Sequence, residues 1–150
     1  MIVIDANVLL YAHDSSDPRH APAVRWLEAT IGGSEAVGLA LTTVLAFIRI
    51  ATDPRVYAIP IATTQAIELV ESWLRRADVH LIGPTDTHWR TFAGLAVAGQ
   101  ARGSMVIDAH LATLALEHGA TLATSDRDFS RFPGLRTIDP TAERGAPQAR

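Results

Sequence analysis

Hydrophobic positions along the chain follow two alternating patterns. Short, nearly continuous apolar runs predict strands over residues 2–5, 36–41, 79–82, 122–124 and 135–138. Longer segments with apolar residues at helical spacing predict helices over 8–13, 20–31, 42–51, 63–76, 86–99 and 104–118. Strands that alternate with helices indicate an α/β fold with a mostly parallel central sheet and right-handed crossovers.

Boundary signals divide the chain further. Gly32 and Gly119 follow two of the helices, Asn7 is placed to cap the first, and Thr42 or Thr43 to cap the third. We therefore expect one domain over residues 1–140. The polar segment 141–150 is expected to be a flexible tail.

Composition limits the chemistry. The chain has 150 residues, is 48% hydrophobic and contains no cysteine, which predicts a globular domain without disulfides, thiolate zinc sites or a cysteine nucleophile. The N-terminus lacks a signal-peptide pattern and no run of about 18 apolar residues occurs, so we expect a cytoplasmic protein with no membrane segment. All 13 basic residues are arginine, which excludes any mechanism that needs a lysine.

Four aspartates stand where an α/β protein would gather them. Asp5 ends the first apolar run, Asp108 opens the helix over 104–118, and Asp126 and Asp128 follow the fourth run. Ligands of open parallel sheets bind beyond the carboxyl ends of the strands. Converging carboxylates repel one another, and Mg²⁺ or Mn²⁺ relieves that repulsion, so the pattern favours metal-assisted hydrolysis of a phosphoester.

Each aspartate also has an ordinary structural interpretation. Asp5 is suited to a turn, Asp108 complements a helix dipole, Asp126 is suited to cap a short helix over 127–132, and Asp128 is suited to that helix's solvated first turn. Four such residues in an order that brings them together favour a site.

Four further residues are candidates for contacts to these acids or to the substrate. Asn7 lies two residues after Asp5, and its amide could hold that carboxylate. Arg49 has apolar neighbours on both sides, which predicts a mostly buried guanidinium with an acidic partner, in the site or in a structural ion pair. Ser125 directly precedes Asp126. His110 lies two residues after Asp108 in the same predicted helix, where a histidine is more often simply packed or solvated.

The motifs together resemble a known family. The matching stretches are Ile4-Asp5-Ala6-Asn7-Val8-Leu9-Leu10, Phe47-Ile48-Arg49-Ile50-Ala51-Thr52, Ile107-Asp108-Ala109-His110-Leu111-Ala112 and Thr124-Ser125-Asp126-Arg127-Asp128-Phe129. In this order they resemble PIN-domain ribonucleases, and among these the VapC-type toxins of bacterial toxin–antitoxin pairs. The resemblance implies a PIN-like α/β/α sandwich, Mg²⁺-dependent endoribonuclease activity and a small antitoxin that occludes the site. It implies metal ligation by Asp5, Asp108 and Asp126, with Asp128 as an additional acid.

One position departs from that pattern. Many PIN nucleases have a glutamate shortly before the position of Arg49, and this chain has Ala46 there. The missing carboxylate favours one tightly held ion over two, and it keeps open a second hypothesis, a non-catalytic PIN-like module that binds RNA or an antitoxin peptide. A receiver domain would need a lysine and a haloacid-dehalogenase-type phosphatase would need Asp-x-Asp after the first strand; both are absent.

The expected partners follow from the chemistry of the acids. An RNA substrate would be a loop or single strand, of the tRNA or rRNA class, because the A-form major groove is too narrow for side chains to read; cleavage would arrest translation. An antitoxin is expected to insert a basic residue among the carboxylates. The apolar helices suggest a homodimer.

Overall fold

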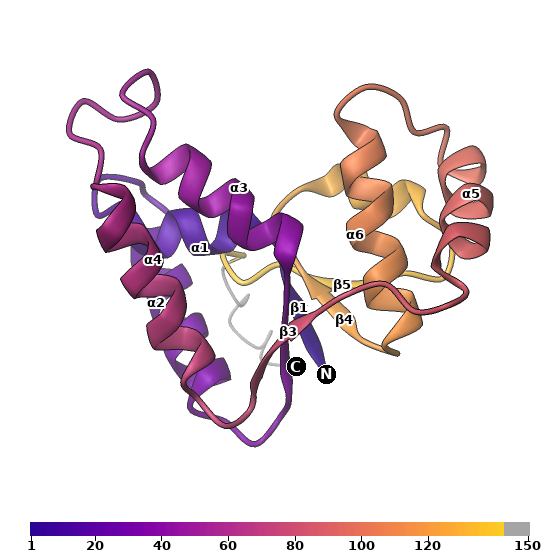
Figure 1. Cartoon of the computed structure of the whole chain (residues 1–150), viewed down its shortest axis with the longest axis horizontal. Helices are drawn as coiled ribbons and strands as arrows, with labels where there is room; N and C mark the ends of the chain where they lie inside the picture. Colours follow the sequence, from indigo (N-terminus) through magenta and orange to yellow (C-terminus); the bar gives the residue numbers. More distant parts are fainter. Residues whose placement is uncertain (143–150) are drawn as a thin grey trace, which may run out of the picture.

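The computed structural model describes residues 1–142, in which five parallel strands form one sheet in the order β3-β2-β1-β4-β5 (Figure 1). The strands are β1 (Ile2–Ile4), β2 (Val37–Ala40), β3 (Val79–Ile82), β4 (Thr121–Ala123) and β5 (Arg136–Ile138). The helices are α1 (Ala6–His13), α2 (His20–Ile31), α3 (Leu41–Ala51), α4 (Thr63–Leu74), α5 (His88–Ala98) and α6 (Met105–Glu117), with the short 3-10 helix η1 (Arg127–Arg131) before β5.

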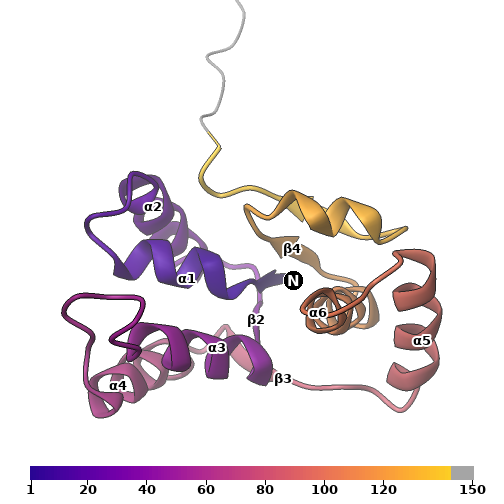
Figure 2. The ribbon, with the colours of Figure 1, turned by 90° about the horizontal axis from the view of Figure 1, so that it is seen from above.

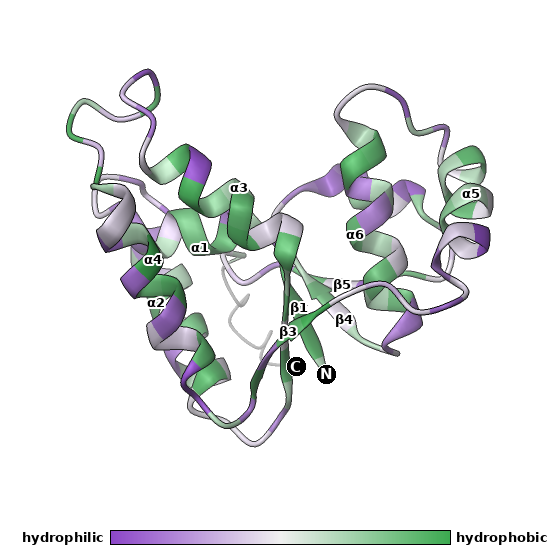
Figure 3. Cartoon of the chain, in the orientation of Figure 1, coloured by the Kyte–Doolittle hydropathy of each residue, from purple (hydrophilic) through white to green (hydrophobic). Residues whose placement is uncertain are grey.

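The sheet separates two hydrophobic cores. Val3 packs with α5, α6 and η1, whereas the next residue, Ile4, packs with α1–α4, because successive side chains of a strand point to opposite faces. Figure 2 shows the two groups of helices on either side of the strands, and Figure 3 shows the apolar character of β1. The expected α/β/α sandwich with a parallel sheet is confirmed.

Helix starts differ from the expected ones. Neither Thr42 nor Thr43 caps α3, which begins at Leu41 directly after β2 without a side-chain cap. Asn7 does not cap α1, because that helix already begins at Ala6 and Asp5 occupies the cap position. Both helices follow their strands with no intervening loop, which a cap signal could not reveal.

The predicted tail lies almost entirely outside the described residues, which end at Ala142. Over residues 1–142, no helix is both long and apolar enough to cross a bilayer.

Candidate active site

The pairing of β1 with β4 brings the first acid to the sheet's carboxyl edge. Ile4 pairs with Ala123, and the Asp5 backbone N–H donates to the Ala123 carbonyl at 3.0 Å. Asp5 is thereby placed beside Thr124, 119 residues later in the chain. In the order β3-β2-β1-β4-β5, the chain leaves β1 toward β2 on one side and β4 flanks it on the other, so this edge is the topological switch point at which such sheets bind ligands.

Thr124 joins the two strand ends through one hydroxyl group. Its Oγ1 donates to Asp5 Oδ2 at 2.7 Å. The same oxygen accepts from Asn7 Nδ2 at 3.2 Å and from the Asp126 backbone N–H at 3.0 Å. Since Thr124 is buried, this network fixes the orientation of the Asp5 carboxylate and the path of the chain into Asp126.

Asp126 has the capping role that its position suggested. Its Oδ1 accepts from the Asp128 backbone N–H at 2.8 Å and begins η1. Capping occupies one carboxylate oxygen and leaves Oδ2 without a hydrogen bond among the described residues, so the structural role does not compete with a role in the site.

Asp108, in the first turn of α6, lies within the electrostatic reach of the other acids. Its pKa is raised from the ordinary 3.8 to about 6, first by partial burial and then by the charges of Asp5, Asp126 and Asp128, while Arg131 opposes the change. Burial also raises the pKa of Asp5, although the hydrogen bond from Thr124 and the backbone N–H groups at the start of α1 oppose it. Asp108 is therefore near enough to the other acids for their charges to act on it, whereas a metal site shared by them stays a prediction.

The residues fit a hard cation in their chemistry. Asn7 Oδ1 is buried and has no hydrogen-bond partner among residues 1–142, an arrangement that costs about 1–3 kcal/mol unless a ligand meets it. The Nδ2 atom of the same amide donates to the Thr124 hydroxyl that also binds the Asp5 carboxylate. All of these donors are oxygen, the ligand type that Mg²⁺ takes. Within residues 1–142, however, no three His, Asp or Glu side chains stand close enough to form a finished metal-binding group.

Three other candidates form no hydrogen bond to the acids within the described residues. Arg49 is exposed on α3 and forms no ion pair within the described part of the chain, so its predicted burial is wrong; its neighbours Phe47 and Ile48 face the core while Arg49 points outward. His110 Nδ1 pairs with His88 Nε2 at 2.9 Å, and Ser125 Oγ donates to the Tyr11 hydroxyl at 3.3 Å.

Two residues with roles at the site were not predicted. Thr124 was assigned only to a strand end, and Arg131 was not considered. Arg131 lies 3.7 Å from the Asp128 carboxylate and donates to the carbonyls of Asp128 and Gly99, which holds its guanidinium near the acids. A polar residue at the end of a strand that pairs with β1 is the signal that could have identified Thr124.

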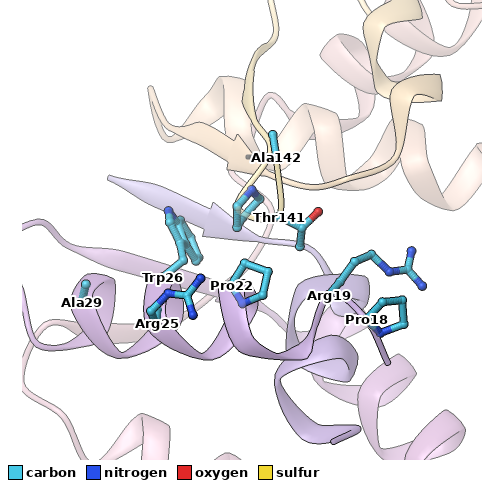
Figure 4. A pocket seen from close by; sticks show the side chains of 9 residues that line it. Pro18, Arg19, Pro22, Arg25, Trp26, Ala29, Thr141 and Ala142 are labelled. Atoms are coloured by element: carbon cyan, nitrogen blue, oxygen red, sulfur yellow. The ribbon is translucent and has the colours of Figure 1, made fainter. Parts of the chain in front are cut away.

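A separate hollow lies elsewhere on the molecule. It has a volume of about 590 Å³ and lies between α2 and residues 140–142, with Arg25 and Trp26 on its wall (Figure 4). Arg19, at one end, is already paired with Asp17 and lies over the Tyr11 ring. The carboxylates do not line this hollow.

Comparison with known proteins agrees with the fold and the motifs. The PIN domain family matches residues 2–135. Ribonuclease VapC37 of Mycobacterium tuberculosis is 39% identical over 142 residues, covering 95% of this chain and 99% of the relative. Ribonuclease VapC33 of the same species is 36% identical over 143 residues, covering 95% and 100%.

Solved structures share the fold at low identity. VapBC-1 from nontypeable Haemophilus influenzae superposes with a TM-score of 0.68 at 21% identity, covering 95% of this chain and all of that one. Mycobacterium tuberculosis VapC20, described as a sarcin-ricin loop cleaving toxin, superposes with a TM-score of 0.63 at 18% identity, covering 91% of this chain and 99% of that one. The family match and the sequence relatives establish that the chain belongs to the PIN-domain family and, within it, to the VapC ribonucleases.

Proposed function

We propose that the protein is a Mg²⁺-dependent endoribonuclease, the toxin of a type II toxin–antitoxin pair, for which Mn²⁺ can substitute. The observation that carries the proposal is the approach of Asp5, Asp126 and Asp128 to the half-buried Asp108, whose pKa is raised to about 6 by burial and by these charges. A site that destabilises its own charged form is explained by a cation that the folded chain binds.

Asp5, Asp108 and Asp126 would hold the ion, with Asp128 as a more distant acid. Such an ion lowers the pKa of bound water and stabilises charge that develops on the phosphate. Thr124 keeps the Asp5 carboxylate in one orientation through the hydrogen bond at 2.7 Å. Asn7 Oδ1 is free to accept from water or to face the ion.

Arg131 is suited to the substrate's phosphate. Its side chain is 30% exposed, its nearest carboxylate, Asp128, is 3.7 Å away, and two backbone carbonyls fix its position. A guanidinium that is held near the acids without a close ion pair can meet a phosphate oxygen with a charge-assisted hydrogen bond.

The proposed substrate is a loop or single strand of tRNA or rRNA, whose cleavage would arrest translation. The acids lie at a sheet edge, where an unpaired strand can be laid down, whereas a regular A-form duplex offers side chains only its shallow groove. That VapC20 is described as cleaving the sarcin-ricin loop supports this class of RNA.

The proposed regulator is an antitoxin that inserts an arginine or lysine among the carboxylates. Similar folds occur in VapBC complexes from Haemophilus influenzae and Salmonella typhimurium. Because an inserted cation and Mg²⁺ would occupy the same field, raising Mg²⁺ should weaken inhibition. Replacing the inserted residue by alanine should restore cleavage more than it weakens binding, and inhibition unaffected by that change would point to steric blockage instead.

A homodimer is proposed through α5. Trp89 and Val97 on this helix are 76% and 79% exposed, more than large apolar side chains usually are.

The deciding experiment is metal titration of RNA cleavage. Purified protein should cut RNA with Mg²⁺ or Mn²⁺, lose activity in chelator and regain it when the metal is restored. Asp5→Asn and Asp108→Asn should abolish cleavage with the fold intact, whereas Asp86→Asn, which neutralises an exposed acid in the loop before α5, should not.

The half-buried Ala46 on α3, where many PIN nucleases have an acid, favours one alternative, an RNA- or antitoxin-binding module that does not cut. That alternative predicts no metal-dependent cleavage of any RNA.

A further inference from the structure

A chain of three polar side chains connects α6 to α5 away from the carboxylates. Glu117 Oε2 lies 2.6 Å from His88 Nδ1, and His88 Nε2 lies 2.9 Å from His110 Nδ1. The side chains of Glu117 and His88 are only 4% and 13% exposed. The Thr85 hydroxyl also donates to the Glu117 carboxylate, so the buried end of the chain is fully satisfied.

The third member, His110, completes the hydrogen bonding of the buried His88 ring at Nε2. His110 also lines an apolar groove of about 410 Å³. The groove walls include Leu41, Leu81, Ile82, Pro84 and Leu114.

The hydrogen bond to His88 engages Nδ1 of His110 and leaves Nε2 as the free ring nitrogen of this groove-lining residue. Hydrogen bonds from Thr85 and His88 lower the pKa of Glu117 in spite of its burial, so its carboxylate accepts both. With a neutral ring, His88 donates to that carboxylate from Nδ1 and accepts at Nε2, which makes His110 Nδ1 the donor to it. In this arrangement His110 Nε2 carries a lone pair, and it has no partner among the described residues.

The groove lies along the same sheet edge as the acids but on another side of α6. Two residues turn a helix by about 200°, so His110 and Asp108 point in different directions. The paired residues Ala40 and Ile82 end β2 and β3 at the edge where Asp5 ends β1. With strands about 4.8 Å apart, the groove is on the order of 10 Å from the carboxylates, within reach of a nucleotide near the cleaved bond.

We propose that this groove binds a nucleobase of the RNA substrate near the cleaved bond, and that His110 Nε2 accepts a hydrogen bond from the exocyclic amino group of that base. The inference rests on the ribonuclease function proposed above. The apolar walls suit the faces of a base, and the volume of the groove falls within the range of about 300–1,000 Å³ for small-ligand pockets. Adenine, cytosine and guanine carry such an amino group, whereas uracil offers only its ring N3–H, so an acceptor aligned with the amino group favours the first three bases. His88 and Glu117 are positioning residues, since they set the orientation and tautomer of His110.

The first test reads cleavage sites by sequencing RNA ends from a random-sequence substrate. The parent should prefer an amino-bearing base at one position near the cut. His110→Leu keeps an apolar wall but removes the acceptor, and it should reduce that preference about tenfold while cleavage at uracil-containing sites continues. Glu117→Gln should weaken the same preference. His80→Leu, which changes an exposed histidine on β3, is the matched control and should leave it unchanged.

The second test needs neither cleavage nor a variant. In metal-free buffer, ring ¹⁵N spectra of the parent should show an unprotonated His110 Nε2, and added CMP or AMP should move its resonance more than UMP does. A protonated Nε2, or equal effects of the three nucleotides, would overturn the inference. This measurement also decides the question if His110→Leu does not fold.

The outcomes separate the inference from the proposed function. A parent that cuts RNA with the same base preference as His110→Leu keeps the ribonuclease function and overturns the base-binding groove. A parent that never cuts RNA removes the proposed function, and the nucleotide titration then decides whether the groove binds a base. A change at His110 that alters only self-association or antitoxin affinity would assign the groove to a protein partner and contradict the inference.

Discussion

Neutralising Asp108 should stabilise the metal-free protein at neutral pH. In the folded chain its pKa is raised from 3.8 to about 6, first by partial burial and then by the charges of Asp5, Asp126 and Asp128. Above pH 6 the folded protein carries a charge that its surroundings disfavour, whereas the unfolded chain carries the same charge in water. Asp108→Asn removes that penalty.

The magnitude follows from the difference between the two pKa values. Without solvent screening it corresponds to about 3 kcal/mol in the free energy of unfolding. Because Asp108 is only partly buried, screening reduces the expected gain to about 1 kcal/mol, or roughly 2–4 °C in Tm for a chain of this size.

The destabilisation caused by the Asp108 charge should grow as the pH rises. A raised folded pKa means that the folded state binds the proton more tightly, so the penalty is full above about pH 6 and disappears as the pH falls through 3.8. Other acids act in the opposite direction, since hydrogen bonds lower the pKa of Asp14, Asp17 and Asp53. The difference between parent and variant isolates Asp108: about 1 kcal/mol at pH 7.5 and close to zero at pH 4.

The assay is urea unfolding of parent and Asp108→Asn in chelator from pH 4 to 7.5, with Asp86→Asn as the control. Adding Mg²⁺ should stabilise the parent more than the variant, since a ligand stabilises the state that binds it. The difference in the free energy of unfolding between the two should therefore narrow or reverse. A variant less stable than the parent at pH 7.5 without metal would refute the reasoning. So would a difference that stays constant across the pH range.

Three further predictions concern other residues. Thr124→Val should destabilise the protein by about 1–3 kcal/mol and reduce cleavage, because the Asp5 carboxylate and the Asp126 backbone N–H lose a buried partner, and Thr124→Ser should restore both in denaturation and cleavage assays. Arg131→Gln should raise KM for RNA about tenfold with little change in kcat, and an unchanged KM in steady-state kinetics would remove Arg131 from the substrate path. Trp89→Arg should shift the protein to monomers in sedimentation velocity without lowering Tm, and a parent that is already monomeric would contradict the α5 interface.

The order of strands and helices was predictable because each element has a period of its own. The helix over 20–31 and the strand over 79–82 agree with the structure residue for residue. The first residues of α1 and α3 were not predictable, because each helix begins directly after its strand, β1 or β2, and carries no side-chain cap. Packing against the sheet decides where these two helices begin.

The site was predictable as far as local sequence determines it. Acids after strands can be assigned to the carboxyl edge, and parallel pairing then brings Asp5 and Asp126 together. Thr124 was missed because its role depends on register: a slip of one residue would move its hydroxyl to the other face. Arg49 was misjudged because apolar neighbours in sequence are not neighbours on a helix face, and the side chain is exposed.

The polar residues of α6 differ in whether hydrogen bonds within the protein account for them. This helix is enclosed by the sheet and α5, so each polar side chain in it needs a reason. Thr113 donates to the Ala109 carbonyl at 2.7 Å, Glu117 is held by His88, and His110 is oriented by the same ring. Asp108 alone among them accepts no hydrogen bond within residues 1–142, and its charged neighbours repel it. A carboxylate kept at such a position lowers the stability of the chain by itself, and the pH and metal experiments above test whether a bound cation is what compensates.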